Sequence, residues 1–213
     1  MSNSRRYKAF LFDMDGTVLN SAASAERVWG DWARRHGLDV VPFLKTMHGR
    51  RSQDTIRDSG VAGLDIDAEA QAITDAEIAD TDGTVEITGA RAFLAALPAD
   101  AWTIVTSASR PLAEARLKAA GLPVPPHMVT AEEISAGKPH PEGYLLGAQR
   151  LGVAPSDCLV FEDTVPGAKA GEAAGADVLV IGGLSVPPHA AAKDYTGLSV
   201  TIADGRLDLR GLQ

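Results

Sequence analysis

The stretch Ala9-Phe10-Leu11-Phe12-Asp13-Met14-Asp15-Gly16-Thr17 decides the fold of this 213-residue chain. Its first four residues are apolar and are followed at once by charge, a pattern typical of a short strand buried on both faces. Two carboxylates, Asp13 and Asp15, come directly after this run. The sequence therefore predicts a central strand near the start of the chain, with acidic side chains at its carboxyl end.

Further strands and helices alternate along the rest of the chain. Short apolar runs similar to the first occupy Trp102–Thr106, Cys158–Phe161 and Val178–Ile181. Helical patterns that begin at a proline and end at a glycine cover residues 111–121, 141–152 and 166–175. This alternation predicts an α/β fold with a Rossmann-like, doubly wound parallel sheet.

One long segment breaks the alternation. Residues 20–88 carry helical patterns and no convincing strand, which predicts a helical insertion after the first strand. We therefore expect residues 1–19 and 89–213 to form the core and residues 20–88 to form a separate helical domain. The part after Leu184 is poorly patterned, and Val200–Ile202 is expected to form an edge strand.

Composition excludes several classes of protein. Hydrophobic residues make up 45% of the chain and charged residues 23%, as in ordinary folded proteins. The formal net charge is −8 and no stretch is densely basic, which argues against a nucleic acid as partner. No apolar run approaches the roughly 20 residues that a membrane span needs. Cys158 is the only cysteine, so no disulfide can form within the chain. We expect a cytoplasmic monomer.

Reactive side chains follow several of the predicted strands. Besides Asp13 and Asp15, these are Ser107 after the second strand and Glu162 and Asp163 at the end of the third. A further candidate, Lys138, lies in a Gly-Lys-Pro loop just before a helix. Ligands of doubly wound sheets bind beyond the carboxyl ends of the strands, so these groups are expected to converge on one pocket.

Paired carboxylates in such a pocket suit phosphoryl transfer. One of Asp13 and Asp15 can attack phosphorus, and the other can protonate the leaving alcohol and later take a proton from water. Asp163 adds a third acid, and three such close carboxylates repel one another unless a cation lies between them. Because Mg²⁺ prefers oxygen ligands, we expect it as the cofactor.

The phosphoryl group needs donors as well as a nucleophile. Lys138 and Ser107 can neutralise and hydrogen-bond its oxygens, and Gly16 allows a close approach of the backbone. Together with Met14 and Ala108, these residues are the candidate phosphate-binding groups.

The four clusters resemble the four motifs of the haloacid dehalogenase-like hydrolases, in order and at suitable spacing. The resemblance implies Asp13 as the nucleophile, Asp15 as the acid and base, and Mg²⁺ held by Asp13, the Asp15 carbonyl and Asp163. It also implies that the helical insertion is a cap that closes over the substrate. Glu162 is expected to orient a metal-bound water or Lys138.

Within that family the chain resembles the branch of sugar, sugar-alcohol and glycerol phosphatases. The segment from His48 to Asp54, His-Gly-Arg-Arg-Ser-Gln-Asp, is similar to a cap motif of this branch. His48, Arg51 and Asp54 are therefore candidates for substrate specificity. Arg51 and Asp54 could equally form a surface ion pair, and His48 could be a packed residue. The expected substrate is a small phosphorylated metabolite of the sugar, sugar-alcohol or glycerol class.

Two alternatives remain at this point. The related β-phosphoglucomutases normally carry a histidine in the first cap helix, where Ala25 stands here, so mutase activity is the less favoured hypothesis. A phospho-receiver signalling domain also uses acids, a lysine and Mg²⁺, but it is about half this length and has no cap. Asp15 beside Asp13 favours hydrolysis over storage of the phosphoryl group.

Overall fold

The run Ala9–Phe12 forms β2, a strand with all four side chains buried. In the computed structural model, which describes residues 6–212, β2 belongs to a five-stranded parallel sheet with the order β5-β2-β6-β7-β8. The partner strands are β5 (Trp102–Ile104), β6 (Cys158–Glu162), β7 (Asp177–Ile181) and β8 (Ala190–Ala192). The predicted parallel sheet is confirmed. Its order reverses between β2 and β6, and such a switch point is where ligands of doubly wound sheets bind.

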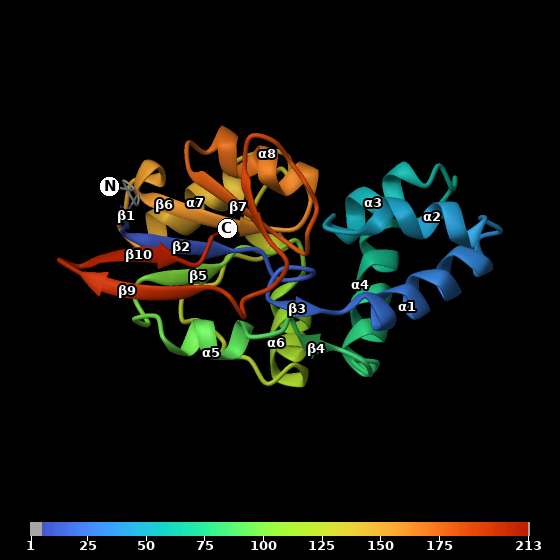
Figure 1. The fold of residues 1–213 in the computed structure, drawn as a ribbon. Helices are drawn as coiled ribbons and strands as arrows, with labels where there is room; N and C mark the ends of the chain where they lie inside the picture. Colours follow the sequence, from blue (N-terminus) through green and yellow to red (C-terminus); the bar gives the residue numbers. More distant parts are fainter. Residues whose placement is uncertain (1–5, 213) are drawn as a thin grey trace.

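Helices cover both faces of this sheet, as a doubly wound fold requires (Figure 1). Phe10 and Phe12 point to one face, where α5 (Ala90–Ala95) and α6 (Arg110–Ala119) pack. Leu11 points to the other, where α7 (Glu142–Arg150) and α8 (Val165–Ala173) pack. The three predicted proline-initiated helices correspond to α6, α7 and α8. The short helix α5, which has no comparable start signal, was not predicted. Two 3₁₀ turns, η1 (Ala131–Glu133) and η2 (Pro155–Asp157), lie in connecting segments.

Four helices beside the sheet form the insertion (Figure 1). They are α1 (Ala22–Arg35), α2 (Val40–Met47), α3 (Ser52–Asp58) and α4 (Ile66–Ala79). They enclose a hydrophobic cluster of their own, in which Trp32 is completely buried.

The expectation of no strand between residues 20 and 88 was wrong. β3 (Leu19–Asn20) and β4 (Val85–Glu86) pair antiparallel, where the chain leaves for the four helices and where it returns. Each has only two residues, so neither carries a period that the sequence could reveal, and their pairing depends on the tertiary fold.

The C-terminal segment forms a second, antiparallel sheet with the order β1-β10-β9. Its strands are β1 (Arg6–Tyr7), β9 (Ser199–Ala203) and β10 (Arg206–Arg210). The strand expected at Val200–Ile202 is thus an edge strand, but of this smaller sheet. Within residues 6–212, none of the helices combines the length and the apolar character needed to cross a membrane.

Candidate active site

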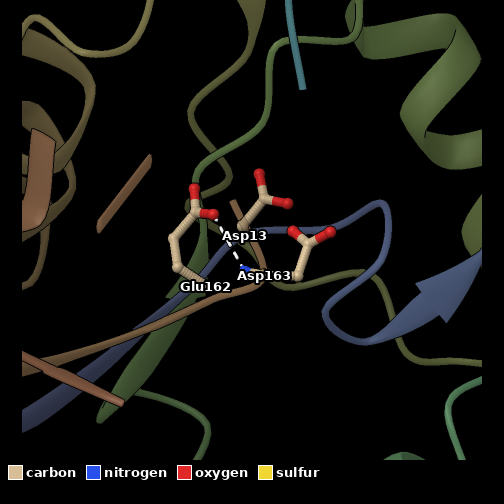
Figure 2. A group of neighbouring side chains, drawn as sticks. All are labelled: Asp13, Glu162 and Asp163. Carbon is tan, nitrogen blue, oxygen red and sulfur yellow. Dashed lines mark hydrogen bonds between the residues drawn. The ribbon is translucent and has the colours of Figure 1, made fainter. Parts of the chain in front are cut away.

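Three carboxylates gather at the switch point of the sheet. Asp13 follows β2 directly, Glu162 is the last residue of β6 and Asp163 comes next (Figure 2). Each offers one oxygen, and these oxygens lie within 4.8 Å of one another. Adjacent parallel strands end at the same edge of the sheet, and the acids predicted at two strand ends are therefore neighbours.

Lys138 supplies a positive charge to this cluster. Its Nζ donates to Asp13 Oδ1 and, at 2.5 Å, to Glu162 Oε1. Burial disfavours a charged lysine, but Asp13 and Glu162 outweigh it and raise the pKa of Lys138 above its ordinary value. The lysine is therefore held in the charged form beside the nucleophile candidate.

Both oxygens of Glu162 accept hydrogen bonds, from Lys138 and from several other donors. Besides the lysine, its Oε1 accepts from Tyr144 Oη at 2.8 Å. Its Oε2 accepts from the amides of Asp163 and Thr164, at 2.9 and 3.0 Å, and from Thr164 Oγ1 at 3.0 Å. Five donors thus occupy the two oxygens of a fully buried carboxylate. Of the two roles expected for Glu162, the contacts favour the orientation of Lys138.

Glycines make room for two of the acids. Gly16 has φ of 86°, and a Cβ there would lie 2.0 Å from Asp163 Oδ2. A Cβ on Gly167 in α8 would lie 1.7 Å from Glu162 Oε1. Neither carboxylate could keep its place beside an alanine. The sequence indicated a special role for Gly16, whereas Gly167 looked like an ordinary helix residue.

The charges of the cluster suit a divalent cation. Burial, and then the neighbouring Glu162, raise the pKa of Asp163 to about 7. Burial also raises the pKa of Asp13 well above its usual range, against the opposing charge of Lys138. Three carboxylates face one ammonium group, and a hard cation bound to oxygens of Asp13 and Asp163 would balance them. The residues therefore fit Mg²⁺.

Asp15 is not one of the three gathered acids, but it lines a cavity of about 60 Å³ together with Asp13. Its Oδ1 accepts from Ser21 Oγ at 2.5 Å. Its Oδ2 lies 3.0 Å from Nη1 of Arg116 in α6. Arg116 in turn contacts Oε1 of Glu77 in α4 at 2.7 Å. None of these three partners was predicted. Nothing in the local pattern distinguishes Arg116 and Glu77 from ordinary helix residues, or Ser21 from an ordinary residue before a helix.

The phosphate-binding candidates take different positions. Ser107 and Ala108 line the cavity with Asp13. Ser107 Oγ donates to the carbonyl of Gly49 at 3.0 Å, and the amide of Ala108 donates to Thr106 Oγ1 at 3.1 Å. The Met14 side chain is buried in the core, which leaves only its backbone for a ligand.

The amide of Gly16 is already used within its own turn. It donates to the carbonyl of Leu19 at 2.7 Å. In this arrangement Gly16 leaves room for the Asp163 carboxylate, while its amide is not free for a ligand.

The cap candidates separate into two groups. His48 lines the cavity, as does Arg50, which was not among the predicted site residues. Arg51 and Asp54 are absent from its lining and pair with each other at 2.7 Å. Nη1 of Arg51 also donates to the carbonyls of Ile134 and Ser135, each at 3.2 Å. The ion-pair interpretation thus describes these two residues here, and the pair ties α3 to the loop that leads to Lys138.

The fold and the site define a class of enzyme, and comparison with known proteins identifies the family. Residues 7–175 match the family model of the haloacid dehalogenase-like hydrolases, and the chain belongs to this family. The predicted family is therefore confirmed, and so is the prediction that the protein is an enzyme that hydrolyses phosphoric monoesters.

Individual relatives agree with this assignment. Hexitol phosphatase A of Escherichia coli (strain K12) is 45% identical over 183 residues, which cover 83% of each chain. Glycerol-1-phosphate phosphohydrolase 2 of Saccharomyces cerevisiae is 30% identical, over 84% of this chain and 76% of the yeast protein. Among solved structures, β-phosphoglucomutase from Clostridium difficile superimposes with a TM-score of 0.73 at 20% identity, over 83% of this chain and 85% of the mutase. This last likeness concerns the fold alone.

Proposed function

We propose that this protein is a Mg²⁺-dependent phosphatase that hydrolyses a sugar, sugar-alcohol or glycerol phosphate through a phospho-aspartate on Asp13. One observation carries the proposal: Asp13 contacts Lys138, adjoins Asp163 and lines the same cavity as Asp15. The nucleophile and the proton-transfer group thus face one cavity, and the charge partner contacts the nucleophile.

The two acids have separate tasks in this reaction. An oxygen of Asp13 attacks phosphorus and the bond to the leaving oxygen breaks, while Asp15 gives that oxygen its proton. Asp15 then takes a proton from the water that cleaves the phospho-aspartate and restores Asp13. Lys138 and Ser107 hold phosphoryl oxygens as charge moves onto them. Mg²⁺, held by Asp13, the Asp15 carbonyl and Asp163, would neutralise part of the negative charge.

The cap has to move for this chemistry to begin. A cavity of about 60 Å³ is far smaller than the roughly 300–1,000 Å³ of most small-molecule sites. Its walls come both from the core and from residues such as His48 and Arg50 between α2 and α3. We therefore assign residues 20–88 to a cap that separates from the core, residues 1–19 and 89–213, to admit the substrate.

The substrate class rests on the relatives and on the cap side of the cavity. The hexitol and glycerol phosphatases above act on polyol phosphates, as their names state. Ala25, which stands where mutases carry a histidine, lines the cavity with its methyl group. A methyl group cannot transfer protons to a sugar hydroxyl, so the site favours hydrolysis over isomerisation.

A phosphate-release screen tests the proposal. We expect Mg²⁺-dependent release from hexitol, hexose or glycerol phosphates, with no release by Asp13→Asn. The same incubations with glucose 1-phosphate are assayed for glucose 6-phosphate. Rapid isomerisation with little free phosphate would establish the mutase instead, and a stable phosphoprotein without turnover would favour the receiver hypothesis.

A further inference from the structure

Arg116 joins three separate parts of the chain at the edge of the active site. One of its nitrogens lies 3.0 Å from Asp15 Oδ2, and the other lies 2.7 Å from Glu77 Oε1. Asp15 follows the central strand, Arg116 belongs to α6 of the core and Glu77 belongs to α4 of the insertion. The guanidinium is therefore a bridge from the cap to the proposed acid and base.

The ion pairs of this bridge are buried. The side chains of Arg116 and Glu77 are only 8% and 3% exposed. A buried charge is costly unless it is paired, so each partner depends on the others for its position. All three residues line the cavity in which Asp13 lies. Loss of either ion pair would therefore alter the position of the Asp15 carboxylate in the cavity.

Both oxygens of Asp15 are oriented by groups at the junction of core and cap. Oδ2 faces Arg116, while Oδ1 accepts from Ser21, the residue just before α1. The link from Arg116 to Glu77 can exist only while α4 packs on α6, as it does here. The position of the Asp15 carboxylate is thus tied to the position of the cap.

We propose that Arg116 and Glu77 are positioning residues that hold Asp15 ready for proton transfer when the cap lies on the core. This inference rests on the proposed role of Asp15 as acid and base. Proton donation would then be available when the cap covers the substrate and would be weakened when α4 moves away from α6.

The leaving group offers a readout that a merely structural role would not move. A p-nitrophenolate departs without a proton. The departure of a phenolate depends more strongly on proton donation, and that of the alkoxide of glycerol 1-phosphate depends on it most. Because kcat/KM includes no step after the leaving group departs, it isolates proton donation from the later attack of water. Phenyl and p-nitrophenyl phosphate also have nearly the same shape, which separates acid catalysis from a lost binding contact.

The variants are Arg116→Met, Glu77→Gln and the double variant, each checked by thermal melting. For Arg116→Met we expect kcat/KM to fall by about 10- to 100-fold with glycerol 1-phosphate, by less with phenyl phosphate and by under about threefold with p-nitrophenyl phosphate. Glu77→Gln should show the same order of effects at about three- to tenfold. The double variant should be no worse than Arg116→Met, because the two residues act through one contact.

Two controls complete the experiment. Lys118→Met removes a cation from an exposed position of the same helix and should leave kcat/KM unchanged for all three substrates. Asp15→Asn should show the same dependence on the leaving group, at greater magnitude. If Asp15→Asn lacks this dependence, the proposed function fails at its acid.

A different result would overturn the positioning roles of Arg116 and Glu77 alone. Asp15→Asn can show the dependence on the leaving group while Arg116→Met and Glu77→Gln lower kcat/KM equally for all three substrates. In that case the bridge only supports the fold, and the inference is overturned. Should Arg116→Met not fold, Glu77→Gln and the charge-balanced double variant decide by the same comparison, and their equal loss on all substrates overturns it too.

Discussion

Gly16 and Asp163 lie so close that a Cβ on Gly16 would stand 2.0 Å from Asp163 Oδ2. Gly16→Ala must therefore displace the carboxylate proposed to bind Mg²⁺. We expect the Mg²⁺ concentration for half-maximal activity to rise at least about tenfold, as when a ligand's surroundings are altered. A Mg²⁺ titration of phosphate release measures it.

Gly175→Ala is the matched control for this change. Gly175 has φ of 85°, almost that of Gly16, but no atom beyond its chain neighbours lies within 4 Å of the position of its Cβ. The variant should lose about 1–2 kcal/mol of stability from the left-handed backbone alone and keep its Mg²⁺ dependence. Equal Mg²⁺ curves for both alanine variants would refute the proposed contact of Asp163 with the metal.

Asp13→Asn should abolish turnover and keep the fold. An amide oxygen does not attack phosphorus. Burial, and then repulsion from Glu162 and Asp163, raise the pKa of Asp13 against the opposing charge of Lys138, and the uncharged asparagine bears neither of these costs. Phosphate release and thermal melting check the two parts. Asp31→Asn, an exposed change in α1, is the control. Substantial activity in Asp13→Asn would remove this residue from the role of nucleophile.

Removal of metal should stop the reaction reversibly. EDTA is expected to inhibit the enzyme, and excess Mg²⁺ to restore it. Mg²⁺ should also raise the melting temperature of the native chain, because it binds the folded site, and should do so much less in Asp163→Asn. An enzyme that remains active in EDTA would contradict the metal assignment.

Arg50 and Arg51 should respond differently to substitution. Each arginine pairs with an acid, Arg50 with Asp58 and Arg51 with Asp54. Arg50 lines the cavity, whereas Arg51 is absent from its lining and donates to two carbonyls of the core. We expect Arg50→Met to raise KM for polyol phosphates more than for p-nitrophenyl phosphate, and Arg51→Met to affect both substrates alike. The opposite result would return Arg51 to the substrate-contact role suggested by its motif.

Cys158 should be inert in the native protein. Burial, helped by Asp157, raises the pKa of its thiol to about 12, from about 9 in an unfolded chain. Above pH 9 the unfolded state loses this proton while the native state keeps it, so the stability contributed at lower pH is lost as the pH rises toward 12. At pH 8 a disulfide reagent should label the thiol only after denaturation. Rapid native labelling with retained structure would contradict the burial, and Cys158→Ala should lose part of this alkaline destabilisation.

By itself, the sequence determined the alternation of strands and helices, the helical insertion and the strand ends that carry Asp13, Asp15, Ser107 and Asp163. These follow from local signals: short apolar runs, prolines that begin helices and glycines that end them. Parallel strands end at one edge of their sheet, so acids at those ends could be expected to meet. The order of the motifs also pointed to the family that the comparisons confirm.

Only the tertiary structure decided which neighbours hold these acids. Asp15 lies in the loop after β2, Glu77 in α4 and Arg116 in α6, and no local period marks an arginine in α6 as the partner of a strand-end acid. Two similar cases are the pairing of β3 with β4 and the presence of Arg50, not Arg51, in the lining of the cavity. Each depends on how two distant surfaces pack, and a contact of that kind has no signature in the residues beside it.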